Sequence, residues 1–87
     1  MRQYQEDIYN ALVKMGIWFG NKTCVATSCG GVTEVFYCMN RIAVVDHHKK
    51  SAKLDNCGFT NAATTARLNA VREFCNDYNY KIKEYGI

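Results

Sequence analysis

The sequence predicts an α+β protein in which a small antiparallel sheet of three to five strands packs against an N-terminal helix and a helix in the C-terminal half. Three observations lead to this prediction. Apolar side chains recur at helical spacing in residues 57–78, and the period changes to two in residues 23–55, as in strands. The chain has 87 residues, too few for two domains with a buried core each, so we expect a single domain over residues 1–87.

The first helix is expected at residues 3–15. One of its faces collects the apolar side chains Tyr4, Ile8, Ala11, Leu12 and Met15. Gly16 can end the helix. The next residues, Ile17–Phe19, are bulky and apolar and precede the turn signal Gly20–Asn21. Because they are consecutive, they cannot all point inward from a regular element, and we expect some of this surface to be exposed.

Five later stretches are expected as strands, and the third is apolar enough to be central. They are Thr23–Ser28, Val32–Met39, Ile42–Asp46, Ser51–Asp55 and Asn79–Tyr85. Gly30–Gly31 is a reversal, and Asn40–Arg41 is a candidate two-residue hairpin turn, although Arg is unusual there. The last stretch alternates like an edge strand, and Lys81 and Lys83 on one of its faces would discourage edge-to-edge association.

The second helix occupies most of the segment Cys57–Tyr78. Gly58 permits a sharp entry, and Thr60 or Asn61 can accept a hydrogen bond from the first free backbone N–H groups. An inward stripe follows at helical spacing. It consists of Thr64, Leu68, Val71, Cys75 and Tyr78. We expect this stripe to cover one face of the sheet, with Leu68, Val71 and Cys75 buried.

Composition narrows the class of protein. Hydrophobic residues are 48% and charged residues 22% of the chain, a globular balance. The net charge of +3 is too small for a strong nucleic-acid binder and has the wrong sign for an acidic DNA mimic. No apolar run is long enough to span a membrane, and the carboxylates near the N-terminus do not fit a signal peptide. We therefore expect a cytoplasmic protein.

The five cysteines favour reduced thiols over a disulfide framework, because their number is odd and no secretory signal is present. The alternative is a zinc site built on Cys24 and Cys29. It would need two further ligands, drawn from Cys38, His47, His48 and Cys57. The chain has neither a C-x-x-C pair nor the histidine spacing of a zinc finger. We expect free thiols, no metal and no cofactor.

The run His47–Lys50 is the densest polar stretch and has three interpretations. It can be a solvated loop, a phosphate contact through Lys49 and Lys50, or a metal-binding or catalytic histidine. We favour the loop, because adjacent side chains of an extended segment point to opposite sides. Asp46 beside His47 suggests a triad, but no nucleophile motif, carboxylate pair or phosphate loop accompanies it. We expect that the protein is not an enzyme.

The string T-T-A-R-L-N at Thr64–Asn69 is the most specific feature of the chain. One interpretation is an anion site, because a helix N-terminus offers free N–H groups and partial positive charge. In the other, which we favour, Thr64 packs inward with Leu68, while Arg67 and Asn69 tie the helix to a neighbouring strand.

This string, preceded by C-G-F, resembles a motif of a widespread set of small bacteriophage proteins, in which a Gly-aromatic turn leads into a T-T-x-x-R-L-N helix. Those proteins commonly have an upstream strand of the form x-V-x-L-x-G-N-x-I-A. The stretch V-F-Y-C-M-N-R-I-A-V-V at Val35–Val45 is similar to it and matches at Asn40, Ile42 and Ala43. The resemblance covers about residues 33–71, roughly half of the chain.

The chain departs from this motif in its turn, where Phe59 stands in place of the usual tryptophan and the approach to Thr64 is longer by a residue. The resemblance implies bacteriophage origin. It supplies no activity, so the motif residues carry no assigned role. These are Thr64, Thr65, Arg67, Leu68 and Asn69.

Size, phage resemblance and an excess of aromatic residues predict an accessory protein that binds a host macromolecule. Six Tyr, four Phe and one Trp are more than so small a core normally encloses, and Tyr, Trp and Arg dominate binding hot spots. The expected partner-binding residues are Trp18, Phe19, Arg41, Tyr80 and Tyr85. The expected action is inhibition of a host defence complex (anti-CRISPR-like) or of a gene-expression complex, in the cytoplasm of the host cell.

The alternative is a nucleic-acid-binding accessory protein that contacts phosphates through a modest basic patch. Its residues would be Arg41, Lys49, Lys50, Lys53, Arg67 and Arg72. A third possibility is a homo-oligomeric structural component. The partner in the first two hypotheses is a host protein, a protein–nucleic acid complex or a nucleic acid, and no membrane is expected to be involved.

Overall fold

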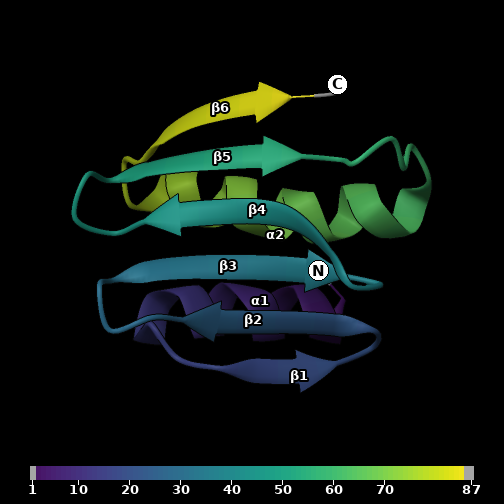
Figure 1. The fold of residues 1–87 in the computed structure, drawn as a ribbon, viewed down its shortest axis with the longest axis horizontal. Helices are drawn as coiled ribbons and strands as arrows, with labels where there is room; N and C mark the ends of the chain where they lie inside the picture. Colours follow the sequence, from purple (N-terminus) through teal and green to yellow (C-terminus); the bar gives the residue numbers. More distant parts are fainter. Residues whose placement is uncertain (1, 86–87) are drawn as a thin grey trace.

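The computed structural model describes residues 2–85 and has two layers, a sheet and a pair of helices (Figure 1). The helices are α1 (Gln3–Lys14) and α2 (Ala62–Asp77). The strands are β1 (Trp18–Gly20), β2 (Thr23–Thr27), β3 (Val32–Tyr37), β4 (Asn40–Asp46), β5 (Ser51–Asp55) and β6 (Lys81–Tyr85). Both helices lie against the same face of the sheet, and no element within residues 2–85 covers the other face.

The sheet has six strands in the order β1-β2-β3-β4-β5-β6, so the prediction of three to five strands was wrong. The strand that periodicity did not reveal is β1, which pairs with β2 in the register Trp18–Val25 and Phe19–Cys24. Trp18 and Phe19 point to opposite faces, yet both are apolar. A strand of three residues with this composition has no visible alternation, so only its pairing identifies it.

The sheet is mixed, which corrects the prediction that it is antiparallel. Neighbouring strands from β1 to β5 are antiparallel, whereas β5 and β6 are parallel. Between β5 and β6 the chain forms α2, and such a helical crossover returns the chain to the same end of the sheet. The sixth strand must therefore run in the direction of the fifth. The α+β class itself is confirmed.

The core lies between the helices and the covered face of the sheet. Leu68, Val71 and Cys75 of α2 are at most 2% exposed, which confirms that these three are buried. Tyr78, the last member of the predicted stripe, follows the end of α2 and is 45% exposed, so that part of the prediction was wrong. Opposite the three buried side chains, one residue from each of four strands is paired in register across the sheet. This row is Val25, Val35, Ala43 and Leu54, and each member is also at most 2% exposed.

The hairpin between β3 and β4 differs from the prediction. The turn is formed by Cys38 and Met39, which both have positive φ angles (50° and 67°), and not by Asn40–Arg41. Positive φ at both turn positions is normally supplied by Asn or Gly, and neither Cys38 nor Met39 is a residue type that indicates such a turn. A register shift between Val35 and Phe36 makes β4 irregular near Ile42.

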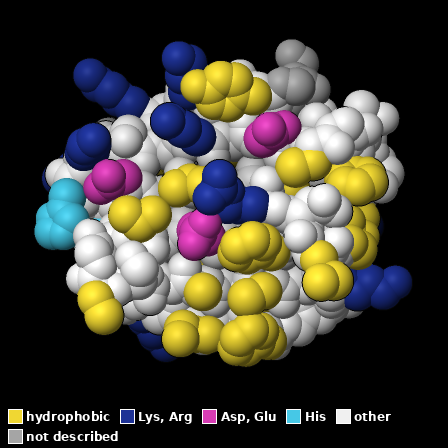
Figure 2. Space-filling model, in the orientation of Figure 1, with side chains coloured by type: hydrophobic (Ala, Val, Ile, Leu, Met, Phe, Trp, Pro, Cys, Tyr) yellow, Lys and Arg dark blue, Asp and Glu magenta, His cyan; other side chains and the backbone are white. Residues whose placement is uncertain are grey.

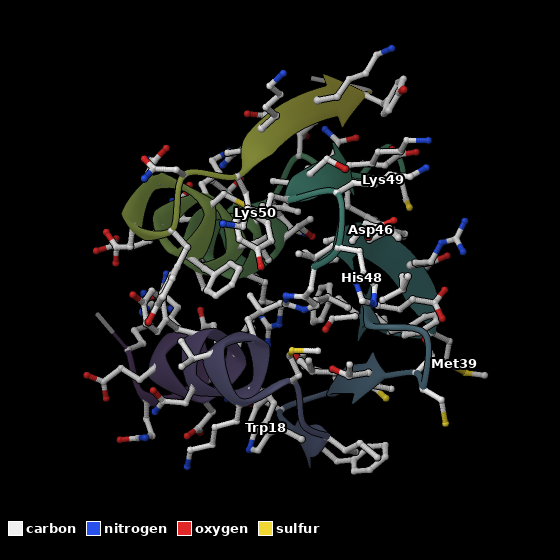
Figure 3. The ribbon with its side chains drawn as sticks, turned by 90° about the vertical axis from the view of Figure 1, so that its left-hand side faces the viewer. Trp18, Met39, Asp46, His48, Lys49 and Lys50 are labelled. Carbon is white, nitrogen blue, oxygen red and sulfur yellow. The ribbon has the colours of Figure 1, made fainter. Side chains whose placement is uncertain are left out.

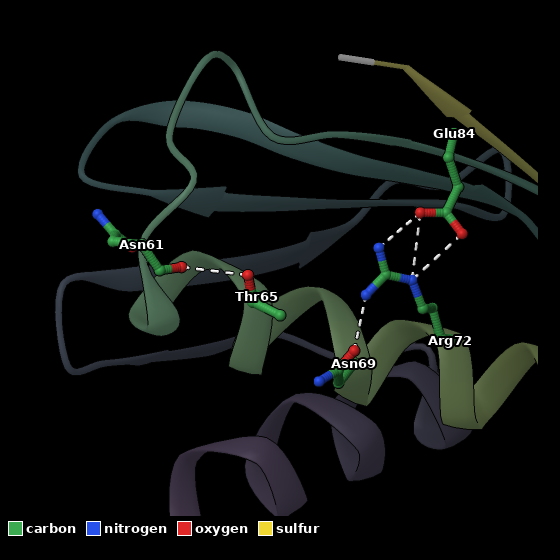
Figure 4. A network of polar contacts seen from close by, with 5 residues as sticks. All are labelled: Asn61, Thr65, Asn69, Arg72 and Glu84. Carbon is green, nitrogen blue, oxygen red and sulfur yellow. Dashed lines mark hydrogen bonds and ion pairs between the residues drawn. The ribbon is translucent and has the colours of Figure 1, made fainter. Parts of the chain in front are cut away.

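The N-terminus of α2 is capped by Asn61, whose side-chain oxygen accepts a hydrogen bond from the Thr64 backbone N–H at 2.9 Å. The Asn61 carbonyl oxygen also accepts a bond from the Thr65 hydroxyl at 3.1 Å (Figure 4). Asn61 is one of the two caps that the sequence allowed. The preceding turn uses the left-handed conformation at Cys57 and Gly58, and glycine adopts this conformation without strain.

Arg67 fastens α2 to the start of the sheet. Its side chain is 4% exposed. Its guanidinium lies between the rings of Tyr4 and Tyr37, 4.4 and 4.0 Å from their centres. The Nε group donates a hydrogen bond to Thr23 Oγ1 at 2.7 Å, and the terminal nitrogens donate to two carbonyl oxygens. These belong to Asn21 and Ala63, each at 2.8 Å.

The T-T-A-R-L-N string is therefore a packing motif in this fold. Thr64 is fully buried beside Leu68, and Arg67 ties α2 to β2 and to the turn before it, as the favoured interpretation predicted. Asn69 does not reach a strand. Its side-chain oxygen accepts a hydrogen bond from Arg72 of the same helix, so that part of the interpretation was wrong.

Candidate functional site

The uncovered face of the sheet is the candidate site, and we call it the open face. Strand pairing decides which side chains point there, because residues paired in register share a face. One row across the sheet is Phe19, Cys24, Phe36 and Arg41, and a second is Ala26, Glu34, Val44, Lys53 and Lys83. Figure 2 looks directly onto this face.

The half of the open face formed by β1, β2 and β3 is apolar. We define the apolar patch as Phe19, Cys24, Phe36 and Met39. Phe19 is 70% and Met39 is 95% exposed, and Met39 projects away from both helices in Figure 3. Cys24, Phe36 and Met39 also line a shallow hollow of about 680 Å³ together with the β1–β2 turn. In Figure 2 the hydrophobic side chains gather over this part of the face.

The half formed by β5, β6 and the β4–β5 turn is basic. We define the lysine strip as Lys49, Lys53, Lys81 and Lys83, all of them exposed. Lys53 of β5 is paired in register with Lys83 of β6, and Asp46 and Asp55 lie on the same half. In Figure 2 dark blue side chains gather in this region, with magenta carboxylates between them. Between the two halves, Arg41 forms an exposed ion pair with Glu34 at 2.9 Å.

A smaller hollow lies on the basic half, between β4 and β6. Its volume is about 310 Å³. Val44 forms part of its floor, and the side chains of Arg41, Lys53, Asp55 and Tyr85 surround it. It therefore brings two cations, one carboxylate and one aromatic ring to a single place on the open face.

His47 is not part of the solvated loop that the sequence suggested. It is half-buried under the β4–β5 turn, and its ring makes hydrogen bonds to Thr33 Oγ1 at 2.7 Å and to the Tyr80 hydroxyl at 2.9 Å. Its ring also packs edge-on against those of Phe74 and Tyr80. The remaining residues of the run, His48–Lys50, are exposed as expected (Figure 3).

The arrangement around His47 is structural and does not form a triad. Asp46 accepts hydrogen bonds from the backbone N–H groups of His48 and Lys49. The bond from Lys49 is the main cause that lowers the pKa of Asp46. Burial lowers the pKa of His47, against an opposing effect of the Asp46 charge. His47 therefore holds the turn as a neutral ring.

The pKa of His47 predicts that the protein loses stability in mild acid. Because the folded pKa lies below the unfolded value of about 6.5, the contribution of neutral His47 is complete above that pH. This stabilising contribution is lost as the pH falls below the unfolded pKa and through the folded pKa, because unfolding then takes up a proton at His47. The free energy of urea unfolding should therefore fall between about pH 7 and about pH 5.

The control for this prediction is His47→Gln, which keeps a hydrogen-bonding side chain without a titrating ring. This variant should show little change over the same interval. The carboxylates whose pKa is lowered, Asp46 and Glu84, lose their contributions only as the pH falls below about 4, the ordinary carboxyl value. An equal decline in wild type and His47→Gln would contradict the role given to His47.

The structure divides the residues that the sequence selected for partner binding. Phe19, Arg41 and Tyr85 lie on the open face. Trp18 points to the covered side, where its ring lies so close to Gly20 that a Cβ there would be 2.8 Å away. Tyr80 is bound to His47 and packs against the core. These last two are not placed to contact a partner on the open face.

The basic residues selected from the sequence are also divided. Lys49 and Lys53 belong to the lysine strip, and Lys50 lies at the same turn, nearer the helices (Figure 3). Arg67 is buried and cannot reach a nucleic acid. Arg72 is paired with Glu84 of β6 at 2.5 Å and with Asn69 (Figure 4), which lowers the pKa of Glu84.

The residues expected from the sequence to bind a partner or a nucleic acid did not include Phe36 and Met39 of the apolar patch, nor Lys81 and Lys83 of the lysine strip. The alternation of β3 placed Phe36 on the face of Glu34, and the structure confirms this, but nothing indicated that this face is uncovered. Lys81 and Lys83 were noted as one face of an edge strand. Their position beside Lys53 depends on the parallel pairing of β5 and β6.

Within residues 2–85, no group of three or more His, Cys, Asp and Glu side chains could hold a metal ion. The cysteines are present as free thiols, and burial raises the pKa of the Cys75 thiol to about 11. No helix in this part of the chain is long and apolar enough to cross a membrane.

The chain matches a family model described as "Kyanoviridae Gp96 protein" over residues 1–87. No curated protein and no solved structure matches the chain. The match confirms the bacteriophage origin predicted in the sequence analysis.

Proposed function

We propose that this chain, which belongs to the Kyanoviridae Gp96 family of bacteriophage proteins, is an accessory protein and binds a host protein. The apolar patch is the proposed contact, and inhibition of a host defence or gene-expression complex in the host cytoplasm is the proposed consequence. The observation that carries the proposal is the exposure of Phe19 and Met39 beside Phe36 on an uncovered sheet face.

The size of the open face supports a protein as the occupant. In the plane of Figure 1 the molecule measures about 30 by 24 Å between Cα atoms, roughly 720 Å². A standard protein interface buries about 800 Å² per partner. The apolar half is about half of this area, which suits the small interface of a transient complex and leaves the basic half of the open face uncovered.

The composition of the apolar patch supports the same conclusion. An aromatic ring and a methionine stand at its exposed end, and both residue types are enriched in protein interfaces. Methionine also adapts its shape to the surface that it contacts. Removing each such side chain from water contributes about 1.5–3 kcal/mol, so Phe19 and Met39 can supply a large part of the binding energy.

The charged groups beside the patch support a polar rim. Arg41 and Glu34 form an ion pair at its border, and Lys22 lines the adjacent hollow. An apolar centre bordered by polar and charged groups is the usual organisation of a protein-binding surface. No catalytic step is part of this proposal.

The test is affinity purification from host lysate with the tagged chain, followed by mass spectrometry. The variant Phe19→Ser/Met39→Ser removes the exposed apolar side chains of the patch. The matched control, Val13→Ser/Ile17→Ser, removes two exposed apolar side chains that lie outside it, 42% and 65% exposed. Wild type and control should retain the same dominant host protein, and the patch variant should retain at least tenfold less of it.

Three results would overturn the proposal. Wild type could retain no host protein, the patch variant could retain as much as the control, or the chain could capture only copies of itself. The last result would favour the homo-oligomeric alternative, which sedimentation would then measure. Circular dichroism of each variant verifies that loss of retention is not loss of folding.

A further inference from the structure

We propose that the basic half of the open face binds single-stranded nucleic acid, with phosphates along the lysine strip and an unpaired base against Tyr85. This site lies on different strands from the apolar patch and takes a different ligand. It therefore goes beyond the proposed function and can fail or succeed independently of it.

The first argument is that no lysine of the lysine strip forms an ion pair with a carboxylate within residues 2–85. The ion pairs within residues 2–85 join Arg41 to Glu34 and Arg72 to Glu84, and neither involves a lysine. Lys53 and Lys83 are direct neighbours across β5 and β6. Lysines held side by side repel one another, and a polyanion that binds both removes this repulsion and releases its own counterions.

The second argument is the asymmetry of charge between the two layers. The helices carry four acidic residues, Glu6, Asp7, Glu73 and Asp77, and three basic ones, Lys14, Arg67 and Arg72. Arg67, one of the cations behind the net charge of +3, is buried. With Arg67 buried and Arg72 paired with Glu84, the net positive charge of the chain lies on the sheet side, and its field would orient the open face toward a phosphate backbone.

The third argument is the hollow beside Tyr85. The Tyr85 ring is 41% exposed, and the Lys83 Nζ atom lies 5.5 Å from its centre. Aromatic rings bind unpaired bases by stacking, with little dependence on sequence. Arg41 and Lys53 at the same hollow are placed for the adjoining phosphates. Asp55 would repel a phosphate but can accept a hydrogen bond from an exocyclic amino group of a base.

The shape of the surface favours a single strand over a duplex. The major groove of DNA admits an α-helix or a two-stranded ribbon, whereas this face belongs to a six-stranded sheet. The stacking of a base on Tyr85 also requires a base that is not already paired. Both features point to a flexible strand that lies across β4, β5 and β6.

The test is fluorescence anisotropy with a labelled oligothymidylate of about 20 nucleotides, titrated at several salt concentrations. Lys53→Ala/Lys83→Ala removes two charges from the strip. The control Lys14→Glu changes the net charge by the same amount on α1, on the opposite layer. The strip variant should bind at least tenfold more weakly. Its slope of log affinity against log salt should be smaller by about 1.4, since each phosphate contact contributes about 0.7. The control should match wild type.

Tyr85 provides a second variant with a different signature. Tyr85→Ala should weaken binding about tenfold without changing the salt slope, because it removes a stacked ring and no charge. Tyr85→Phe should bind like wild type. A duplex of equal length should bind more weakly than the single strand.

Any of three results would overturn this proposal: no binding of the oligonucleotide by wild type at low salt, equal weakening by the strip variant and Lys14→Glu, or preference for the duplex. The outcome is separable from that of the proposed function. Phe19→Ser/Met39→Ser should still bind the oligonucleotide, and Lys53→Ala/Lys83→Ala should still retain the host protein.

Discussion

Arg67→Ala should leave little folded protein at room temperature. The substitution removes three hydrogen bonds from a buried side chain, each contributing about 1 kcal/mol. It also leaves a cavity between Tyr4 and Tyr37, whose rings enclose the guanidinium. The expected loss is about 3–5 kcal/mol, comparable with the whole stability of a domain of this size, about 3–5 kcal/mol.

Urea unfolding followed by circular dichroism measures this effect. Arg67→Lys should recover only part of the loss, because an ammonium group cannot direct hydrogen bonds to three acceptors as a planar guanidinium does. The control is Arg41→Ala, which breaks an exposed ion pair and should cost less than about 1 kcal/mol. An unfolding free energy for Arg67→Ala within about 0.5 kcal/mol of wild type would contradict the structural role of this residue. If the prediction holds, loss of binding by an Arg67 variant reports unfolding and not a lost contact.

Phe74→Ala is expected to cost about 3–5 kcal/mol as well. Phe74 is 2% exposed and stands at the centre of an aromatic cluster. Its ring lies 4.9 to 6.0 Å, centre to centre, from those of Tyr9, His47, Tyr78 and Tyr80. These rings come from both helices, the β4–β5 turn and the residue before β6, so the cavity would loosen several elements at once.

The loss in Phe74→Ala would be measured by urea unfolding beside Tyr78→Ala, in which the truncated ring is already 45% exposed. Tyr78→Ala should therefore cost much less. The cavity also admits water beside His47, so the pKa of His47 should move up toward its ordinary value as desolvation is relieved. Equal losses in the two variants would show that Phe74 is not the centre of the cluster.

The sequence predicted the structure correctly where a local pattern of apolar residues is compatible with only one structure. The apolar stripe of α2 predicted that Leu68, Val71 and Cys75 are buried, and the alternation in β3 predicted that Phe36 shares a face with Glu34. It was insufficient where structure depends on contacts between distant segments. Trp18–Gly20 is a strand only because Thr23–Thr27 pairs with it.

The candidate site was predictable only in part, for the same reason. Phe19, Arg41 and Tyr85 were selected as exposed or charged residues of binding type, but the sequence did not reveal that they share one face. Arg67 looks like any other basic residue in the sequence, and only the fold shows that Tyr4 and Tyr37 enclose it. Lys83 belongs to the lysine strip because it pairs with Lys53, and α2 separates these two residues in the sequence.

The parallel edge strand has a consequence for the order in which the protein assembles. Each pair of neighbours from β1 to β5 is joined by a short connection, so closing these hairpins costs little chain entropy. By contrast, β6 reaches β5 only after the whole of α2 and its two connections have been made. Until β6 pairs with β5, a nascent chain exposes the backbone N–H and C=O groups along the edge of β5. Such an unpaired edge can pair with another chain, so the protein is prone to aggregate during synthesis. When β6 pairs, it replaces the bare edge of β5 with an edge that carries Lys81 and Lys83, and charged side chains on an edge strand oppose further strand pairing.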